Sequence, residues 1–204
     1  YTLSERKKPY IYLFFEDIDY LPNIYFKDIV TGTKHSMNDM FNNIGVIKLA
    51  NSHVFNTNRL EYADFSIYTN LNPSRVLIYG PCIKEVTNLD ASNLISMEFA
   101  SYDTSLRHVS LIGTPVVNAE TVERYKNADT GFAITSIKNL TSLDSESVNE
   151  IATKLLHDIP TIRSFFSGYT IKTGLSNYLN STQYNQLTSE TKQLLASRGY
   201  TVDL

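Results

Sequence analysis

Three six-residue stretches carry the pattern that decides the fold: LEYADF at residues 60–65, IKEVTN at 83–88 and LRHVSL at 106–111. Each starts with a large aliphatic residue and has a second apolar residue three positions later, and the starts at Leu60, Ile83 and Leu106 are evenly spaced. The first and third stretches also have an apolar sixth residue, which completes the template Leu-x-x-Leu-x-Leu, whereas the second has Asn88 there. This template, repeated at such an interval, is typical of leucine-rich repeats, in which the apolar positions of a short strand point into a stacked core.

The same template recurs outside this series, at residues 44–49 and 94–99. The stretch at 94–99 begins midway between the second and third members of the series. We therefore expect residues 44–204 to form an α/β fold, a degenerate leucine-rich-repeat-like solenoid with short parallel strands and short helices.

The first 43 residues have a different pattern. Residues 10–15 and 23–30 are rich in aromatic and β-branched side chains, and they flank a turn around Leu21-Pro22-Asn23. This arrangement predicts a pair of strands. Residues 1–43 are therefore expected to form a β-rich N-terminal segment that caps the first repeat or docks onto another subunit.

A second repeat marks the C-terminal third of the chain. Glycine, an aromatic residue, a small residue and a β-branched residue follow one another in GFAI at 131–134, GYTI at 168–171 and GYTV at 199–202. Glycine is suited to end a helix because it adopts the left-handed conformation without a Cβ penalty. We expect residues 131–134, 169–172 and 200–203 to be neighbouring parallel strands, each entered from a helix.

The helices expected before these glycines lie at residues 119–125, 145–156 and 191–196. The middle one has the clearest signal, because Asp144 or Ser145 can cap it and its apolar residues recur at helical spacing. Those apolar residues are Val148, Ile151, Ala152, Leu155 and Leu156.

The stretch from residue 140 to residue 204, LTSLDSESVNEIATKLL through to SRGYTVDL, resembles the C-terminal end of BspA-like leucine-rich repeat proteins. In that family the array closes with a helical segment and a terminal strand of glycine, an aromatic residue, threonine and an aliphatic residue. Members occur in bacterial surface proteins and in phage or prophage virion proteins. The resemblance implies a solenoid-like domain used for display and contact, with no catalytic residues to carry over.

Composition limits the possible partners. Lys and Arg number 18 against 21 Asp and Glu, so the net charge is −3 and there is no long basic run of the kind that binds nucleic acid. The apolar run at residues 11–15 is too short to insert into a membrane. Cys82 is the only cysteine, which excludes an intrachain disulfide, and we interpret it as a small buried hydrophobe.

Motifs for chemistry are scarce. The four histidines have no metal-ligand spacing, and the chain lacks the GxSxG, P-loop and GxGxxG motifs, so we expect no catalytic residues, no metal and no cofactor. The best acidic pair is Asp17 and Asp19, which would share one face of a strand. That pair supports a third and weaker interpretation, a fragment of a carbohydrate-active enzyme.

These patterns favour a non-enzymatic structural or interaction protein. The first hypothesis is a phage virion component, a fibre or a head or tail decoration, which contacts other virion proteins, further copies of itself as a trimer, or a host glycan or protein. The alternative is a bacterial cell-surface adhesin with the same fold. Strand residues that point away from the core would line the contact face, and the candidates are Ser96, Glu98, His108 and Ser110.

Overall fold

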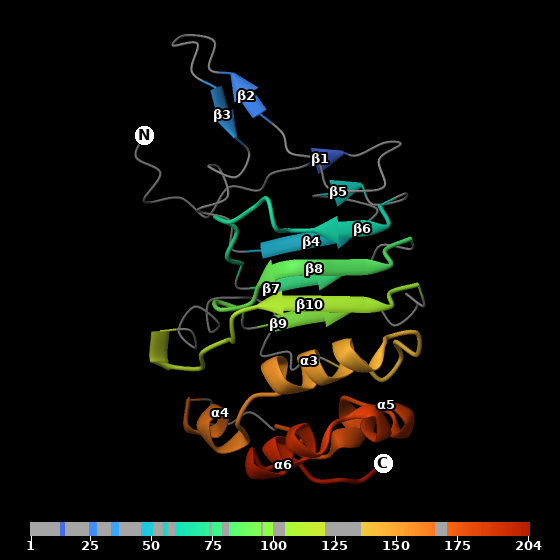
Figure 1. Ribbon diagram of the computed structural model, residues 1–204. Helices are drawn as coiled ribbons and strands as arrows, with labels where there is room; N and C mark the ends of the chain where they lie inside the picture. Colours follow the sequence, from blue (N-terminus) through green and yellow to red (C-terminus); the bar gives the residue numbers. More distant parts are fainter. Residues whose placement is uncertain are drawn as a thin grey trace.

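The computed structural model describes residues 13–14, 25–27, 34–36, 46–50, 55–56, 60–73, 75–78, 82–94, 96–99, 105–120, 136–165 and 171–204. Within these ranges the strands are stacked above one another, and the helices of the C-terminal part lie together at one end of the stack (Figure 1). Short parallel strands and short helices were expected, and both are confirmed.

The strands belong to two parallel sheets and one antiparallel pair. Sheet A has the order β1 (Leu13–Phe14), β5 (Phe55–Asn56), β4 (Val46–Ala50), β7 (Arg75–Ile78) and β9 (Ser96–Phe99). Sheet B has the order β10 (His108–Ile112), β8 (Glu85–Asp90) and β6 (Tyr62–Asp64). From β6 to β10 the chain alternates between the sheets, so that each strand of one is followed by a strand of the other.

Sheet B preserves the even spacing of the three sequence stretches. Tyr62 of β6 pairs with Glu85 of β8, which in turn pairs with His108 of β10. The first and fourth residues of the three stretches point inward and are buried; they are Leu60, Ala63, Ile83, Val86, Leu106 and Val109. The template therefore identified the core positions of this sheet correctly.

Asn88 breaks the template because β8 contains one extra residue. Val86 pairs with Val109 but Leu89 pairs with Leu111, so three positions of β8 match two of β10. Asn88 has a φ of 58°, the left-handed conformation that asparagine tolerates better than most residues, and β-bulges use it to absorb an extra residue. The apolar side chain expected at position 88 is instead Leu89, which is fully buried.

The remaining template matches belong to sheet A. The backbone of Ile47 is paired with Val76, and Val76 with Met97, while Leu49, Ile78 and Phe99 are aligned in the same way. The side chains of Val76, Ile78 and Met97 are fully buried. The sequence pattern did not distinguish the two sheets, because the inward and outward positions alternate in the same way in both.

The N-terminal strands pair differently from the prediction. β1 pairs in parallel with β5 of sheet A, whereas β2 (Tyr25–Lys27) pairs in antiparallel fashion with β3 (Lys34–Ser36). Strands do lie within residues 10–15 and 23–30, but the expected pairing between these two stretches is wrong.

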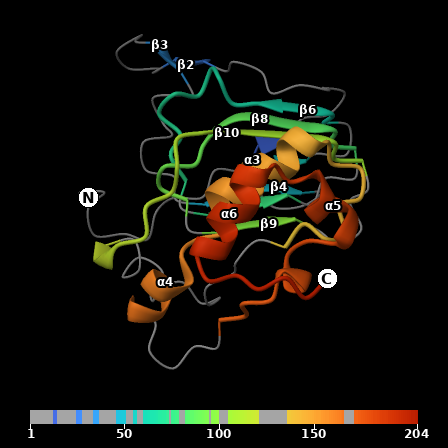
Figure 2. The same ribbon diagram turned by 60° about the horizontal axis from the view of Figure 1, so that its bottom comes forward.

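The C-terminal helices are α3 (Ser145–Leu155), α4 (Ile159–Phe165), a 3-10 helix (Leu175–Asn177), α5 (Ser181–Gln186) and α6 (Ser189–Ser197). α3 contacts β10 on one side and α5 and α6 on the other, so it lies between the strands and the remaining helices (Figure 2). Asp144 caps α3 as predicted, and its five predicted apolar residues are buried. Gly199, with a φ of 88°, follows α6 as expected.

The strands predicted at the repeated glycine motifs are absent from those parts of the motifs that the structure describes. Residues 131–134, 168–170 and most of 119–125 lie outside the described residues, and residues 171–173 and 200–203 do not form strands. One parallel bridge joins Gly174 to Thr201, and the side chain of Val202 is 62% exposed.

Polar contacts explain this outcome. Asp203 turns its carboxylate onto Ser176, accepting hydrogen bonds from the backbone N–H and from Oγ, each 2.8 Å long. A Cβ on Gly174 would overlap that carboxylate, so a larger residue there would require the Asp203 side chain to move. Hydrogen bonds, rather than a row of buried apolar side chains, therefore fix the end of the chain.

The bulge in β8 gives a first testable prediction. Asn88→Gly retains access to positive φ, whereas Asn88→Val places a β-branched side chain in the left-handed region at a cost of about 1–2 kcal/mol. Both changes remove the Asn88 side chain, so the glycine variant is the matched control. Urea unfolding should show the valine variant to be less stable than the glycine variant by about that amount. Equal stabilities would contradict the assigned bulge.

Candidate interaction face

The outward-pointing residues of sheet B form a polar surface. Because Ala63, Val86 and Val109 point into the core, their neighbours along each strand point outward. We define the outer face of sheet B by two rows that cross the strands. The first row comprises the paired residues Tyr62, Glu85 and His108. The second comprises the paired residues Asp64 and Thr87 together with Ser110, which follows Val109 at the bulge.

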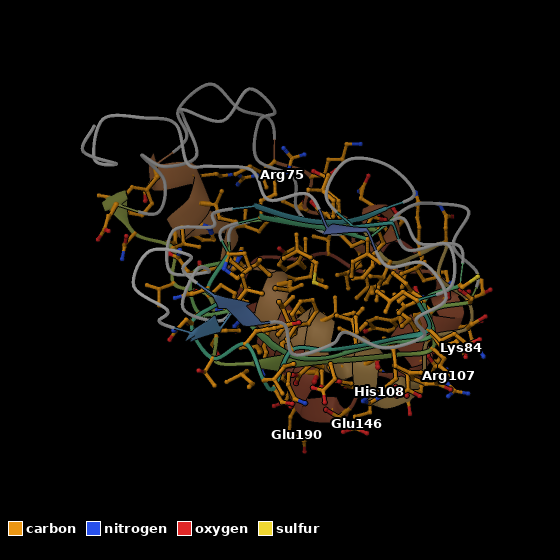
Figure 3. All side chains as sticks on the ribbon, turned by 90° about the horizontal axis from the view of Figure 1, so that it is seen from above. Arg75, Lys84, Arg107, His108, Glu146 and Glu190 are labelled. Atoms are coloured by element: carbon orange, nitrogen blue, oxygen red, sulfur yellow. The ribbon has the colours of Figure 1, made fainter. Side chains whose placement is uncertain are left out.

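Acid–base pairs link successive strands at this face. Lys84 Nζ lies 2.6 Å from Glu61 Oε2, and Arg107 Nη2 lies 2.7 Å from Glu85 Oε1. Lys84 Nζ also lies 6.0 Å from the centre of the Tyr62 ring. Hydrogen bonds to Glu61 and Glu85 raise the pKa of Lys84 and Arg107 respectively. The labelled Lys84, Arg107 and His108 lie along one side of the molecule (Figure 3).

His108 is held by the start of α3. Its Nδ1 lies 2.8 Å from Asp144 Oδ2 and 3.4 Å from Ser147 Oγ. Asp144 also accepts a 2.8 Å hydrogen bond from the Ser147 N–H through Oδ1, as the cap of the helix. Partial burial would raise the pKa of Asp144, but the hydrogen bonds from Ser147 and His108 outweigh it and lower the pKa. The imidazole is thus fixed in orientation at the end of the face that lies next to α3.

This Ser, His and Asp grouping does not have the geometry of a hydrolase triad. In a triad the aspartate contacts Nδ1 of the histidine and the serine contacts Nε2. Here Asp144 and Ser147 both contact Nδ1. Ser147 is also fully buried, and its Oγ accepts a 2.7 Å hydrogen bond from the Val109 N–H. The grouping serves to orient side chains and to provide hydrogen-bond partners for backbone groups.

Asn88 joins the second row of the face together. Its Nδ2 donates a 2.8 Å hydrogen bond to Asp64 Oδ1, which also accepts from the Ser66 N–H at 3.0 Å, and its backbone N–H donates to Ser110 Oγ at 3.3 Å. Partial burial by itself would raise the pKa of Asp64, but the hydrogen bonds have the larger combined effect and lower it. Sequence reasoning missed Asn88 as part of the face. The available signal was the interrupted template, with a residue type that accepts positive φ at the interruption.

The four predicted contact residues are divided between the two sheets. His108 and Ser110 lie on β10 in the outer face of sheet B, while Ser96 and Glu98 belong to β9 of sheet A. Glu98 Oε1 lies 2.6 Å from Arg75 Nη2, which Figure 3 shows on the side opposite His108. The four residues do not make one surface.

The remaining predictions concern the acidic pair, the cysteine and metal binding. Asp17 and Asp19 lie outside the described residues. Cys82 is partly exposed, so the expectation of a buried thiol is wrong. Among the residues with described placement, no group of three or more His, Cys, Asp or Glu is arranged to hold a metal ion. In that same part of the chain, no helix is both long enough and apolar enough to cross a membrane.

A buried histidine joins α3 to the end of the chain. His157 follows α3 with 8% of its surface exposed, and Tyr200 Oη donates a 2.9 Å hydrogen bond to its carbonyl oxygen. Arg198 Nη1 donates to the carbonyl oxygens of Thr153 and Leu156 at 2.6 and 2.8 Å. Burial, with a smaller contribution from the Arg198 charge, lowers the pKa of His157 to about 4.

Comparisons with protein-family models, curated proteins and solved structures found no match to this chain. The similarity to BspA-like leucine-rich repeat proteins therefore stays a prediction.

His157 predicts acid sensitivity. The folded state keeps it neutral down to about pH 4, whereas the unfolded chain takes up a proton below about pH 6.5. The free energy of unfolding should therefore fall as the pH falls from 6.5 to 4, by roughly 3 kcal/mol at about 1.4 kcal/mol per pH unit. Urea unfolding across this range should show the loss in the wild type and a flatter profile in His157→Gln. A steep profile in His157→Gln would contradict the assignment.

Proposed function

We propose that the chain contains a leucine-rich-repeat-like solenoid in which each turn contributes one strand to sheet A and one to sheet B. The alternation of the chain between the sheets supports this, as does the constant step in sheet B from Tyr62 to Glu85 and from Glu85 to His108. In this proposal residues 1–43 form a β-rich N-terminal segment. Residues 44–204 form the repeat domain, with the C-terminal helices as its cap.

The proposed function is that of a non-enzymatic structural and interaction protein. The observation that carries it is the outer face of sheet B, where polar side chains are held in rows by bonds to the neighbouring strand or to the start of α3. Asp64 is fixed by Asn88, Glu85 by Arg107 and His108 by Asp144. A surface ordered before contact loses less side-chain entropy when a partner binds. Such a surface suits recognition of a protein or a glycan.

The proposed setting is a phage particle, in which the chain serves as a fibre or as a head or tail decoration. Its partners there would be other virion proteins, further copies of itself, as in a trimer, or a host-surface glycan or protein. The alternative setting is the bacterial cell surface, where the same face acts in an adhesin. Both settings follow from the resemblance to BspA-like proteins, and immunogold labelling of particles and cells separates them.

The solenoid proposal is tested by two deletions that differ by one residue. Removing residues 85–107 takes out one whole step of sheet B and puts His108 opposite Tyr62, with Val109 still pointing inward. Removing residues 86–107 leaves one residue too many, and the whole of β10 is turned to the wrong face. The first variant should fold and unfold cooperatively in urea, and the second should not. Indistinguishable circular dichroism and unfolding curves would contradict the proposal.

The recognition proposal is tested on arrays of bacterial surface glycans and on intact bacterial cells. A double variant, Tyr62→Ala with Ser110→Arg, removes the exposed aromatic ring and blocks the second row of the outer face. It should weaken binding at least tenfold, which is about 1.4 kcal/mol. Glu98→Gln on sheet A is the matched control and should bind as the wild type does. Wild-type protein that binds no array or cell, or equal losses in both variants, would contradict the proposal.

A further inference from the structure

β10 is the edge strand of sheet B at its helical end, and α3 occupies the place of a further strand. In a parallel sheet, alternate residues direct their N–H and C=O groups to opposite neighbours. On the side away from β8, the Val109 N–H donates to Ser147 Oγ at 2.7 Å and the Leu111 N–H donates to Glu150 Oε1 at 2.9 Å. Lys154 Nζ donates to the Leu111 carbonyl oxygen at 2.6 Å.

Helical spacing allows one helix to make all these bonds. Ser147, Glu150 and Lys154 lie at intervals of three and four residues, so they share one face of α3. One more backbone bond precedes them, since the Asp144 N–H donates to the Arg107 carbonyl oxygen at 2.8 Å. We call Ser147, Glu150 and Lys154 the α3 clamp. The clamp satisfies the groups that would otherwise bind the backbone of an added strand.

We propose that the α3 clamp is an autoinhibitory contact on a strand-acceptor edge, and that the strand accepted when α3 is displaced is β6 of a second copy of this chain. Among the strands that the structure describes, β6 pairs with β8 alone. Its own chain already places it in parallel register with β8, with Tyr62 opposite Glu85. The inference uses only these pairings and does not depend on what the outer face binds.

Charge and packing both fit this partner. Glu61, Lys84 and Arg107 occupy equivalent positions before their strands, and Glu61 is already paired with Lys84 on the neighbouring strand. A second copy added in the same register would set its Glu61 beside Arg107, whose guanidinium already contacts Glu85 of the neighbouring strand. Its Ala63 would face Val109, as Ala63 and Val86 are paired within one chain. Repeated addition of this kind does not close on itself, so it would build a filament.

The experiment weakens the clamp and traps the new pairing. Glu150→Ala with Lys154→Ala leaves the apolar face of α3 intact, and a Cys82→Ser background carries Tyr62→Cys and His108→Cys. Within one chain β8 separates these two cysteines by about 9.6 Å, twice the strand spacing and beyond the roughly 7 Å limit for a disulfide. Between copies in the proposed register they are directly opposite. The matched out-of-register control pairs Tyr62→Cys with Ser110→Cys.

We expect the clamp variant to keep its circular dichroism spectrum and to show a mass by light scattering that rises with concentration. It should form disulfide-linked multimers with the 62 and 108 pair, at least tenfold more than with the control pair or with an intact clamp. If the double variant unfolds, Lys154→Ala alone replaces it, with the same cross-link expected. A folded variant whose mass does not change, association without the cross-link, or equal cross-linking with the clamp intact would each overturn the proposal.

Discussion

The need to cover the free edge of β10 is the constraint on which the rest of the structure depends. A stack of parallel strands leaves a row of unpaired backbone groups at its last strand, and burying such groups without partners is costly. α3 meets this need with Ser147, Glu150 and Lys154 while it packs its apolar residues on the core. The same helix begins at Asp144, which orients His108. Core, strand edge and outer face therefore share one element.

The sequence predicted the structure correctly where the spacing of apolar residues allows only one set of buried side chains. Apolar residues three positions apart in a strand-forming stretch predicted which side chains are buried in sheet B. The cap and the apolar face of α3 were also predicted correctly. The polar side of α3 was not. Ser147, Glu150 and Lys154 look like an ordinary solvent-facing stripe, because helical spacing says which residues lie together but not what they meet. The buried Ser147 shows that this stripe faces a strand.

Two other features could not be predicted, for related physical reasons. Membership of sheet A or sheet B depends on the direction of the connecting turns, and both sheets show the same alternation of inward and outward residues. The repeated glycine motif predicted that residues 200–203 form a strand. Val202 and Leu204 are exposed, and the bonds of Asp203 to Ser176 hold the tail instead. The hydrogen bonds of the Asp203 carboxylate, and not the glycine motif, determine the path of the last residues.

The acid–base pairs on the outer face are better understood as a device for register than as a source of stability. Exposed pairs such as Lys84 with Glu61 and Arg107 with Glu85 contribute little to stability, because solvent screens the attraction between their charges. A slip of one residue, however, would break both pairs and at the same time turn Val86 out of the core. The charges and the apolar row thus select the same alignment. The spacing of any recognition surface on this face is consequently set by the backbone of the core beneath it.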